Sequence, residues 1–318
     1  MKEYRLSKAV SAVAGLCLLP TAGQAVAAFP DHAITVLVPF NAGGIVDTGT
    51  RTWVPYMEKC LGATLVVINK GGAGGDIGTT QLALAKPDGY TIASLVAPNM
   101  ITGGIVKKAE YTLDSFTYLG AFYDSRTTLA VAKDSPFRTL KDLVEAAKTK
   151  PINIGLSAIG SDDYLAALQF EKLSGAQFNL IPLGGGAAGR DAMLGGHVDA
   201  ASMSVADSSP YQDSLRILAV AAENRLSLIP DVPTFREFGY DHVAGGLTFL
   251  AAPAGIPADA QAKLNECFTS TAKDAGFIAD ANKRALIVGT RDGDQLKQEI
   301  MSQDTKLRAL WKSDPWIK

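Results

Sequence analysis

The sequence predicts an α/β fold built from two similar units, each a mainly parallel β-sheet flanked by helices. Three observations support this. Short β-rich segments alternate with amphipathic helical patterns, glycine-rich turns connect several strands to the next helix, and the pattern occurs twice, over residues 30–125 and 126–248. Strands separated by helices at this spacing are typical of parallel sheets with right-handed crossovers. A chain of 318 residues is also long enough for two domains.

The first unit is expected to contain three strands with helices between them. In chain order these elements are strand 34–40, helix 46–61, strand 64–68, helix 77–85 and strand 90–96. The turn Pro87-Asp88-Gly89 precedes the third strand, and its residue types favour a tight turn.

The second unit repeats this arrangement. Its predicted elements are strand 127–132, helix 139–148 with Thr139 as N-cap, strand 152–156, helix 162–173, strand 178–182, helix 187–194 and strands 198–203 and 215–221. A further strand is expected over 247–252, and the chain is mostly helical from Ala258 onward. Those last helices have no sheet of their own, so we expect them to cover the first unit. The predicted domains are therefore 28–125 with 249–318, and 126–248.

The first 27 residues have the features of a signal peptide. Lys2, Arg5 and Lys8 precede an uncharged apolar stretch over 9–19, and Ala25-Val26-Ala27 offers a cleavage site near Ala27. The apolar stretch is short for a membrane span, although an uncleaved anchor is the alternative. We therefore expect an exported mature chain.

Composition narrows the classes of function. The chain is 47% hydrophobic and 19% charged with a formal net charge of −2, which is typical of a globular protein. Because no basic run with interleaved aromatic residues occurs, we expect no nucleic-acid partner. Cys60 and Cys267 remain after signal cleavage. They can form a disulfide in an oxidising compartment or stay as two buried thiols, and the sequence leaves both open.

Two glycine-rich turns that follow apolar strands predict an anion site. A turn without bulky side chains leaves backbone N–H groups bare at a helix N-terminus, where the helix dipole favours negative charge. Parallel strands end at the same edge of a sheet, so both turns are expected to face one ligand. The alternative is that the glycines only permit tight turns. The candidate residues are Phe40, Asn41, Ala42, Gly43 and Gly44 in the first turn, and Gly72, Ala73, Gly74 and Gly75 in the second.

Other candidate ligand-binding residues stand at further strand ends and helix starts: Asp47, Ala97, Asn99, Arg126, Ser157, Gly160, Ser161, Gly185 and Asp207. Asp47 is more simply a residue that accepts N–H bonds and holds the first turn. Arg126 and Arg190 offer a guanidinium for a carboxylate, or else lie on the surface. Asp162 and Asp163 would repel an anion unless they cap a helix or meet a cationic part of the ligand.

No catalytic set is evident in the sequence. Three histidines show no metal-ligand spacing, no phosphate loop is present, and Ile77 stands where a dinucleotide motif needs its third glycine. We therefore expect neither catalytic residues, nor a metal, nor a cofactor. An α/β enzyme acting on a carboxylate or phosphate is the alternative, and it would need a nucleophile or base in the cleft.

The chain resembles the periplasmic solute receptors of tripartite tricarboxylate transporters, the Bug family. The matching stretches run in order through most of the mature chain: 29–30, 34–44 with Asp47, 66–78, 85–91, 134–140, 194–199, 229–234 and 252–255. The resemblance implies a type II-like, two-domain Venus-flytrap fold that closes on a small carboxylate in the periplasm. It also implies a monomer that delivers this ligand to a large and a small membrane subunit.

Two departures from the family pattern lie in the second unit. The family often has Pro-Tyr-Lys-Gly-Gly where this chain has Pro182-Leu183-Gly184-Gly185-Gly186, and it often has a histidine near Asp162 and Asp163. Since the second domain contacts the far end of the ligand in this family, both departures bear on which carboxylate binds.

Overall fold

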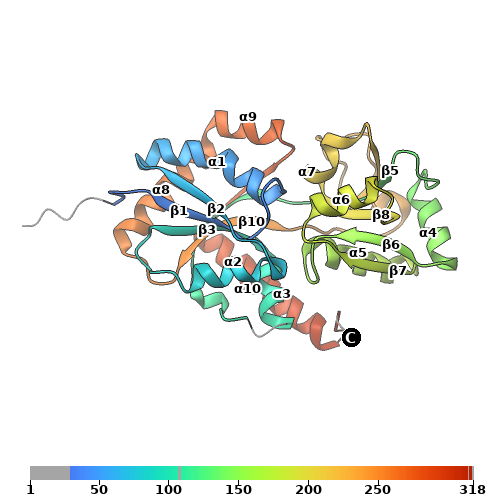
Figure 1. The fold of residues 1–318 in the computed structure, drawn as a ribbon, viewed down its shortest axis with the longest axis horizontal. Coiled ribbons are helices and arrows are strands. Elements are labelled where there is room, and N and C mark those ends of the chain that lie inside the picture. The colour runs from blue at the N-terminus through green and yellow to red at the C-terminus, as the bar shows by residue number, and fades with distance from the viewer. Residues whose placement is uncertain (1–28, 107–108, 314, 317–318) are drawn as a thin grey trace, which may run out of the picture.

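Two β-sheets, each covered by helices, form two domains that lie side by side (Figure 1). The computed structural model describes residues 29–106, 109–313 and 315–316, so the signal peptide expected over 1–27 lies outside the described residues. The two-domain α/β fold expected from the sequence is confirmed.

The first sheet has the order β11-β4-β10-β3-β1-β2. Its strands are β1 (Ile34–Val38), β2 (Leu65–Asn69), β3 (Thr91–Ala97), β4 (Phe116–Asp124), β10 (Leu247–Pro253) and β11 (Ile287–Asp292). It is flanked by α1 (Ile45–Leu61), α2 (Asp76–Ala83), α3 (Asn99–Val106), α8 (Ala258–Lys273), α9 (Ala275–Lys283) and α10 (Gly293–Ser313).

The second sheet has the order β7-β6-β8-β5-β9. Its strands are β5 (Thr127–Ala132), β6 (Ile152–Leu156), β7 (Phe178–Pro182), β8 (Ala200–Ser204) and β9 (Leu215–Val220). Its helices are α4 (Leu140–Thr149), α5 (Asp162–Ser174), α6 (Gly186–Leu194) and the short α7 (Val205–Ser208). Thr139 caps α4 as predicted, because its side chain accepts the N–H of Asp142.

Both sheets are mixed, whereas the sequence favoured mainly parallel ones. β1 pairs in parallel with β2 and β3, and β6 does so with β7 and β8, but β4, β5, β9, β10 and β11 form antiparallel pairs. The antiparallel strands follow from the two crossings between domains, which bring β10 back beside β3 and β4. The parallel strands are those built from strand–helix–strand repeats, where the sequence pattern was clearest.

The chain after Ala258 is mostly helical, as expected, and it contributes one strand that the sequence did not indicate. The last helices do cover the first domain, with α8 packed against α1 and β4, but β11 joins the edge of the first sheet beside β4. β11 reads Ile-Val-Gly-Thr-Arg-Asp and is half-buried or exposed throughout, so it lacks the apolar run of a central strand.

The chain crosses between the sheets at Ser125–Arg126 and near Gly245. The two crossings contact each other: the N–H of Ser125 donates to the carbonyl of Gly246 at 2.8 Å. A Cβ at Gly245 would lie 1.9 Å from the Ser125 oxygen, so only glycine allows this approach. We propose these crossings as the hinge between residues 28–125 with 249–318 and residues 126–248. β10 already begins at Leu247, two residues before the expected boundary.

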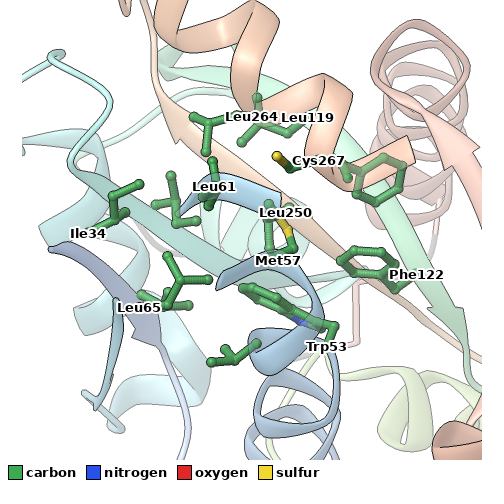
Figure 2. Close-up of a cluster of buried hydrophobic side chains, with 14 of the residues drawn as sticks. Ile34, Trp53, Met57, Leu61, Leu65, Leu119, Phe122, Leu250, Leu264 and Cys267 are labelled. Atoms are coloured by element: carbon green, nitrogen blue, oxygen red, sulfur yellow. The ribbon is translucent and has the colours of Figure 1, made fainter. Parts of the chain in front are cut away.

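The core of the first domain lies between α1, the sheet and α8 (Figure 2). Trp53 and Met57 of α1 face Phe122 of β4 and Leu264 of α8 in this cluster, and all four side chains are buried. Within this cluster Cys267 of α8 is buried, and it forms a disulfide with Cys60 of α1, with Cα atoms 5.4 Å apart. Of the two alternatives for these cysteines, the structure contains the disulfide.

The C-terminal segment reaches from the first domain to the second. Trp311 at the end of α10 and Trp316 beyond it pack edge to face, with ring centroids 4.7 Å apart. They belong to a cluster with Tyr164 and Leu165 of α5, and the Tyr164 hydroxyl donates to the Trp316 carbonyl at 2.7 Å. This cluster therefore joins α10 to the second domain.

Within the described part of the chain, every helix is too short or too polar to cross a bilayer.

Candidate binding site

A cavity of about 280 Å³ lies between the two domains. This volume is close to the lower end of the range of ligand pockets, about 300–1,000 Å³. The first domain and the crossing line it with Phe40, Asn41, Ala42, Gly44, Ile45, Val46, Val96, Asn99, Ser125, Leu247 and Thr248. The second domain lines it with Ser157, Asp162, Asp163, Gly184, Gly185, Gly186, Ala187, Ala188, Asp191, Ser204 and Asp207.

On the first-domain side the wall is the start of α1. Gly44 is the N-cap of this helix and no side chain caps it, so the N–H groups of its first turn keep their capacity to bind an anion. Gly44, Ile45 and Val46 line the cavity, which places this helix start against the ligand space. The first glycine-rich turn therefore lies where the sequence analysis expected an anion.

Asp47 fixes the shape of this turn. It is buried, and its Oδ2 accepts the N–H of Gly43 at 2.9 Å. Its Oδ1 accepts from Arg51 Nε at 2.9 Å and from Asn69 Nδ2 at 3.0 Å. Gly43 has φ of +85°, a conformation that glycine adopts without strain. Asp47 and Gly43 therefore support the turn from behind, and neither lines the cavity.

The opposite wall includes the start of a second helix. α6 begins at Gly186, its N-cap is Gly185, and no side chain caps it. Gly184, Gly185 and Gly186 all line the cavity. Two uncapped helix N-termini, one from each domain, therefore meet the same space, and both favour a ligand with negative charge.

Acidic side chains surround this second helix start. Asp163 is buried and saturated: its Oδ2 accepts from the N–H and Oγ of Ser157 at 2.8 and 2.6 Å, and its Oδ1 accepts from Ser161 Oγ and the N–H of Tyr164. Asp207 Oδ2 accepts from Ser204 Oγ at 2.7 Å.

Burial of these carboxylates opposes their ionisation. Burial, with the charge of Asp163 nearby, raises the pKa of Asp162 to about 7. Burial also raises the pKa of Asp207 to about 6 and that of Asp163 above its ordinary value. Ionisation of the aspartates in the second-domain wall therefore lowers the free energy of unfolding of the ligand-free protein.

This effect predicts how the stability of the ligand-free protein depends on pH. The folded state holds a proton on Asp162 that the unfolded chain has lost, so stability falls as pH rises from about 4 to about 7. We expect Asp162→Asn to remove this loss, so that the Tm of the variant relative to wild type increases from about pH 5 to about pH 8. Burial lowers the pKa of His242 to about 4. Because His242 is present in both proteins, its effect on the difference in Tm cancels. Thermal unfolding of both measures this, and a constant difference would contradict it.

Eight of the eighteen predicted ligand-binding residues line the cavity: Phe40, Asn41, Ala42, Gly44, Asn99, Ser157, Gly185 and Asp207. Asn99 is notable because its Nδ2 donates to the carbonyl of Gly74 while its buried Oδ1 has no partner. Ser125 Oγ, also buried and without a partner, lines the same cavity.

The second glycine-rich turn lies outside this cavity. Gly72, Gly74 and Gly75 all have positive φ, and a Cβ at Gly75 would lie 3.1 Å from the Phe40 ring. The turn therefore supports the Phe40 turn from beneath. Ala73 and Gly74 line a small separate recess with Asn99.

Gly160, Ser161 and Ala97 have structural roles outside the cavity. Ser161 caps α5 by accepting the N–H of Tyr164. The carbonyl of Gly160 accepts from Thr102 Oγ1 of the first domain at 2.8 Å, and Ala97 pairs with Leu247 in the sheet. Of these three residues, Gly160 joins the two domains, whereas Ser161 and Ala97 each make contacts within one domain. All three lie outside the cavity lining.

Neither arginine considered in the sequence lines the cavity. Arg126 donates to the carbonyl of Ser125 at 3.0 Å and lines a second cavity, of about 380 Å³, between α5, α10 and the crossings. Arg190 pairs with Asp191 at 2.9 Å, donates to the Asp207 carbonyl and lies 3.9 Å over the Tyr211 ring.

Sequence reasoning missed several lining residues for two reasons. Asp162, Asp163 and the Gly184–Gly186 turn were noted, but their role depended on which face of the fold they share. Val96, Leu247 and Thr248 have no distinctive sequence pattern, because the antiparallel pairing of β10 with β3 brings them to the cavity. Ser125 reaches the cavity from the crossing after β4.

The fold and the cavity between two domains are those of the periplasmic binding proteins. The solved structure of the periplasmic binding protein BugD is similar, with a TM-score of 0.83 and 29% identity over 90% of this chain and 98% of that one. MatC from Rhodopseudomonas palustris, solved with bound malate, has a TM-score of 0.82 and 26% identity over 89% of this chain and 99% of that one.

The family follows from the sequence comparisons. The model of the tripartite tricarboxylate transporter family receptor matches residues 50–313. Protein BugT of Bordetella pertussis is 31% identical over 71% of this chain and 72% of its own length. The UPF0065 protein in gbd 5'region of Cupriavidus necator is 33% identical over 82% of this chain and 80% of its own length. The chain belongs to this receptor family, whose members bind solutes and are not enzymes.

Proposed function

We propose that this protein is a periplasmic solute receptor that binds a small organic carboxylate by hinge closure and delivers it to a tripartite tricarboxylate transporter. The observation that supports this best is the meeting of two uncapped helix N-termini, α1 and α6, on one cavity between two domains. The carboxylate would lie against the Gly44–Val46 helix start. The malate bound in MatC supports the same class of ligand for this chain.

The rest of the proposal follows from the family. The exported chain would act as a monomer after removal of its first 27 residues, and a large and a small membrane subunit would receive the ligand. Closure would occur about the crossings at Ser125 and Gly245, because the described chain passes from one sheet to the other there and the two crossings lie side by side.

A thermal-shift screen tests the proposed function. Protein unfolded and refolded to remove co-purified ligand is screened against mono-, di- and aminocarboxylates. We expect at least one to raise the Tm in a dose-dependent way, with stabilisation of about 2.7 kcal/mol at a hundredfold excess over the Kd. The methyl ester of each hit is the control, since it lacks the anionic charge. The absence of any shift across the set would reject the proposal.

A further inference from the structure

The ionisable side chains that line the cavity are all acidic. Asp162, Asp163, Asp191 and Asp207 line it, while none of its lining residues in the described part of the chain is Lys, Arg or His. The helix N-termini offset one anionic group on the ligand, but a second carboxylate pointing at this wall would meet carboxylates. The lining therefore suits a ligand whose second group is not an anion.

Two of these four aspartates are available to a ligand. Asp163 already accepts four hydrogen bonds, and Asp191 is paired with Arg190. Asp162 and Asp207 form no ion pair with the described residues. Both line the cavity, although Asp162 also lines the second cavity beside α10. Asp207 Oδ2 lies near Gly186 of the cavity lining, and Asp162 Oδ2 lies near Gly246 at the crossing. A Cβ at Gly246 would lie 2.8 Å from Asp162 Oδ2, and one at Gly186 would lie 2.5 Å from Asp207 Oδ2.

A second, independent observation concerns two buried polar atoms that have no hydrogen-bond partner. Asn99 Oδ1 and Ser125 Oγ are buried, line the same cavity and have no hydrogen-bond partner. The side chains are only 8% and 9% exposed, and leaving such groups unsatisfied is unfavourable. An amide oxygen can only accept, so Asn99 calls for an N–H or O–H on the ligand. An ammonium group supplies three donors together with a positive charge.

We propose that the ligand is a small aminocarboxylate, with its carboxylate on the start of α1 and its ammonium group facing Asp162 and Asp207. This inference rests on the proposed function and narrows its ligand class. The first domain then recognises the carboxylate, and the two second-domain aspartates select for the amine. A dicarboxylate of the same length lacks a positive charge to stabilise the ionised form of these two aspartates.

A dicarboxylate could bind only if protons replaced the amine. Protonated Asp162 and Asp207 would then donate to the second carboxylate, and its affinity would fall as pH rises through about 6 to 8. An ammonium ligand favours the ionised aspartates, so its affinity rises over the same range. The charged groups that face Asp162 and Asp207 are Asp163 of α5, Arg190 and Asp191 of α6, Arg126 at the crossing and Lys306 of α10.

Isothermal titration of matched sets tests the proposal. Each set contains an α- or ω-amino acid, the same carbon chain without the amine, and the chain with a carboxylate in place of the amine. We expect the amine-bearing member to bind at least about tenfold more tightly than either partner, and its affinity to rise with pH. A dicarboxylate that binds more tightly than its amine partner would overturn the proposal while leaving the proposed function intact. If no member of any set binds, the proposed function fails.

Two variants locate the selectivity. Asp162→Asn and Asp207→Asn are expected to lose most of the preference for the amine while still binding the carboxylate. Asp213→Asn, an exposed aspartate in the same domain, is the matched control and is expected to bind as wild type does. Thermal unfolding without ligand shows that each variant folds. Unchanged preference in both cavity variants would also overturn the proposal.

Discussion

Replacing both Cys60 and Cys267 with alanine is expected to lower the free energy of unfolding by about 4–5 kcal/mol. The disulfide closes a loop with a sequence separation of 207 residues, and bridging so long a loop removes much of the entropy of the unfolded chain. It joins α1 to α8 within the cluster around Trp53 and Phe122, so its loss also loosens the first-domain core. Denaturant unfolding of both proteins measures the difference.

The same experiment has an internal control. Under strong reduction the wild-type protein should unfold at nearly the midpoint of the variant, because both then lack the bridge. A midpoint that the substitutions leave unchanged under oxidising conditions would contradict the expectation. Ligand affinity should survive the change, since Cys60 lies 15 residues along α1 from the helix start, about 22 Å at 1.5 Å per residue.

The largest effect on binding is expected from Gly44→Leu. Gly44 has φ of −79° and ψ of 174°, which any residue adopts, and a Cβ there would meet only the Asn41 oxygen, at 3.8 Å. The protein should therefore fold with a loss of about 1 kcal/mol from the poorer N-cap. The leucine side chain would crowd the cavity at the helix start that holds the carboxylate. We expect ligand affinity to fall at least about 100-fold, near 2.7 kcal/mol.

The matched control is Gly104→Leu. Gly104 is an exposed glycine in α3 outside the cavity, and a Cβ there would meet nothing within 4 Å. Titration of both variants with a ligand identified by the thermal-shift screen should leave only the control with wild-type affinity. Normal affinity in Gly44→Leu would place the carboxylate elsewhere in the cleft.

The fold could be predicted where local pattern and tertiary role coincide. β5, β6 and β7 lie on the expected residues, and α1, α4 and α5 within one residue at each end, because apolar periodicity, caps and turn glycines all agree there. β4 was not anticipated: its sequence Phe-Thr-Tyr-Leu-Gly-Ala-Phe-Tyr-Asp is buried on both faces and shows no alternation. β11, at a sheet edge, has too few apolar residues to stand out.

The candidate site could be predicted only in part, for a related reason. The Phe40–Gly44 turn is proposed to bind the ligand through backbone N–H groups at a helix start. Its glycine-rich sequence therefore predicts an anion site before the fold is known. Asp162, by contrast, reads as an ordinary residue in the first turn of a helix. Its proposed role depends on Gly246, which comes from a crossing more than eighty residues later. The second glycine turn suggested a direct ligand contact, and the structure instead places it beneath Phe40.

The three tryptophans of the chain occupy two different environments, and this gives the protein an intrinsic fluorescent probe. Trp53 is enclosed in the first-domain core, where ligand has little reason to alter its emission. Trp311 and Trp316 pack where the C-terminal segment contacts α5, so their surroundings change when the domains move apart. Emission from a Trp53→Phe variant would therefore come only from the contact between domains, and hinge motion could be followed in solution without an attached dye.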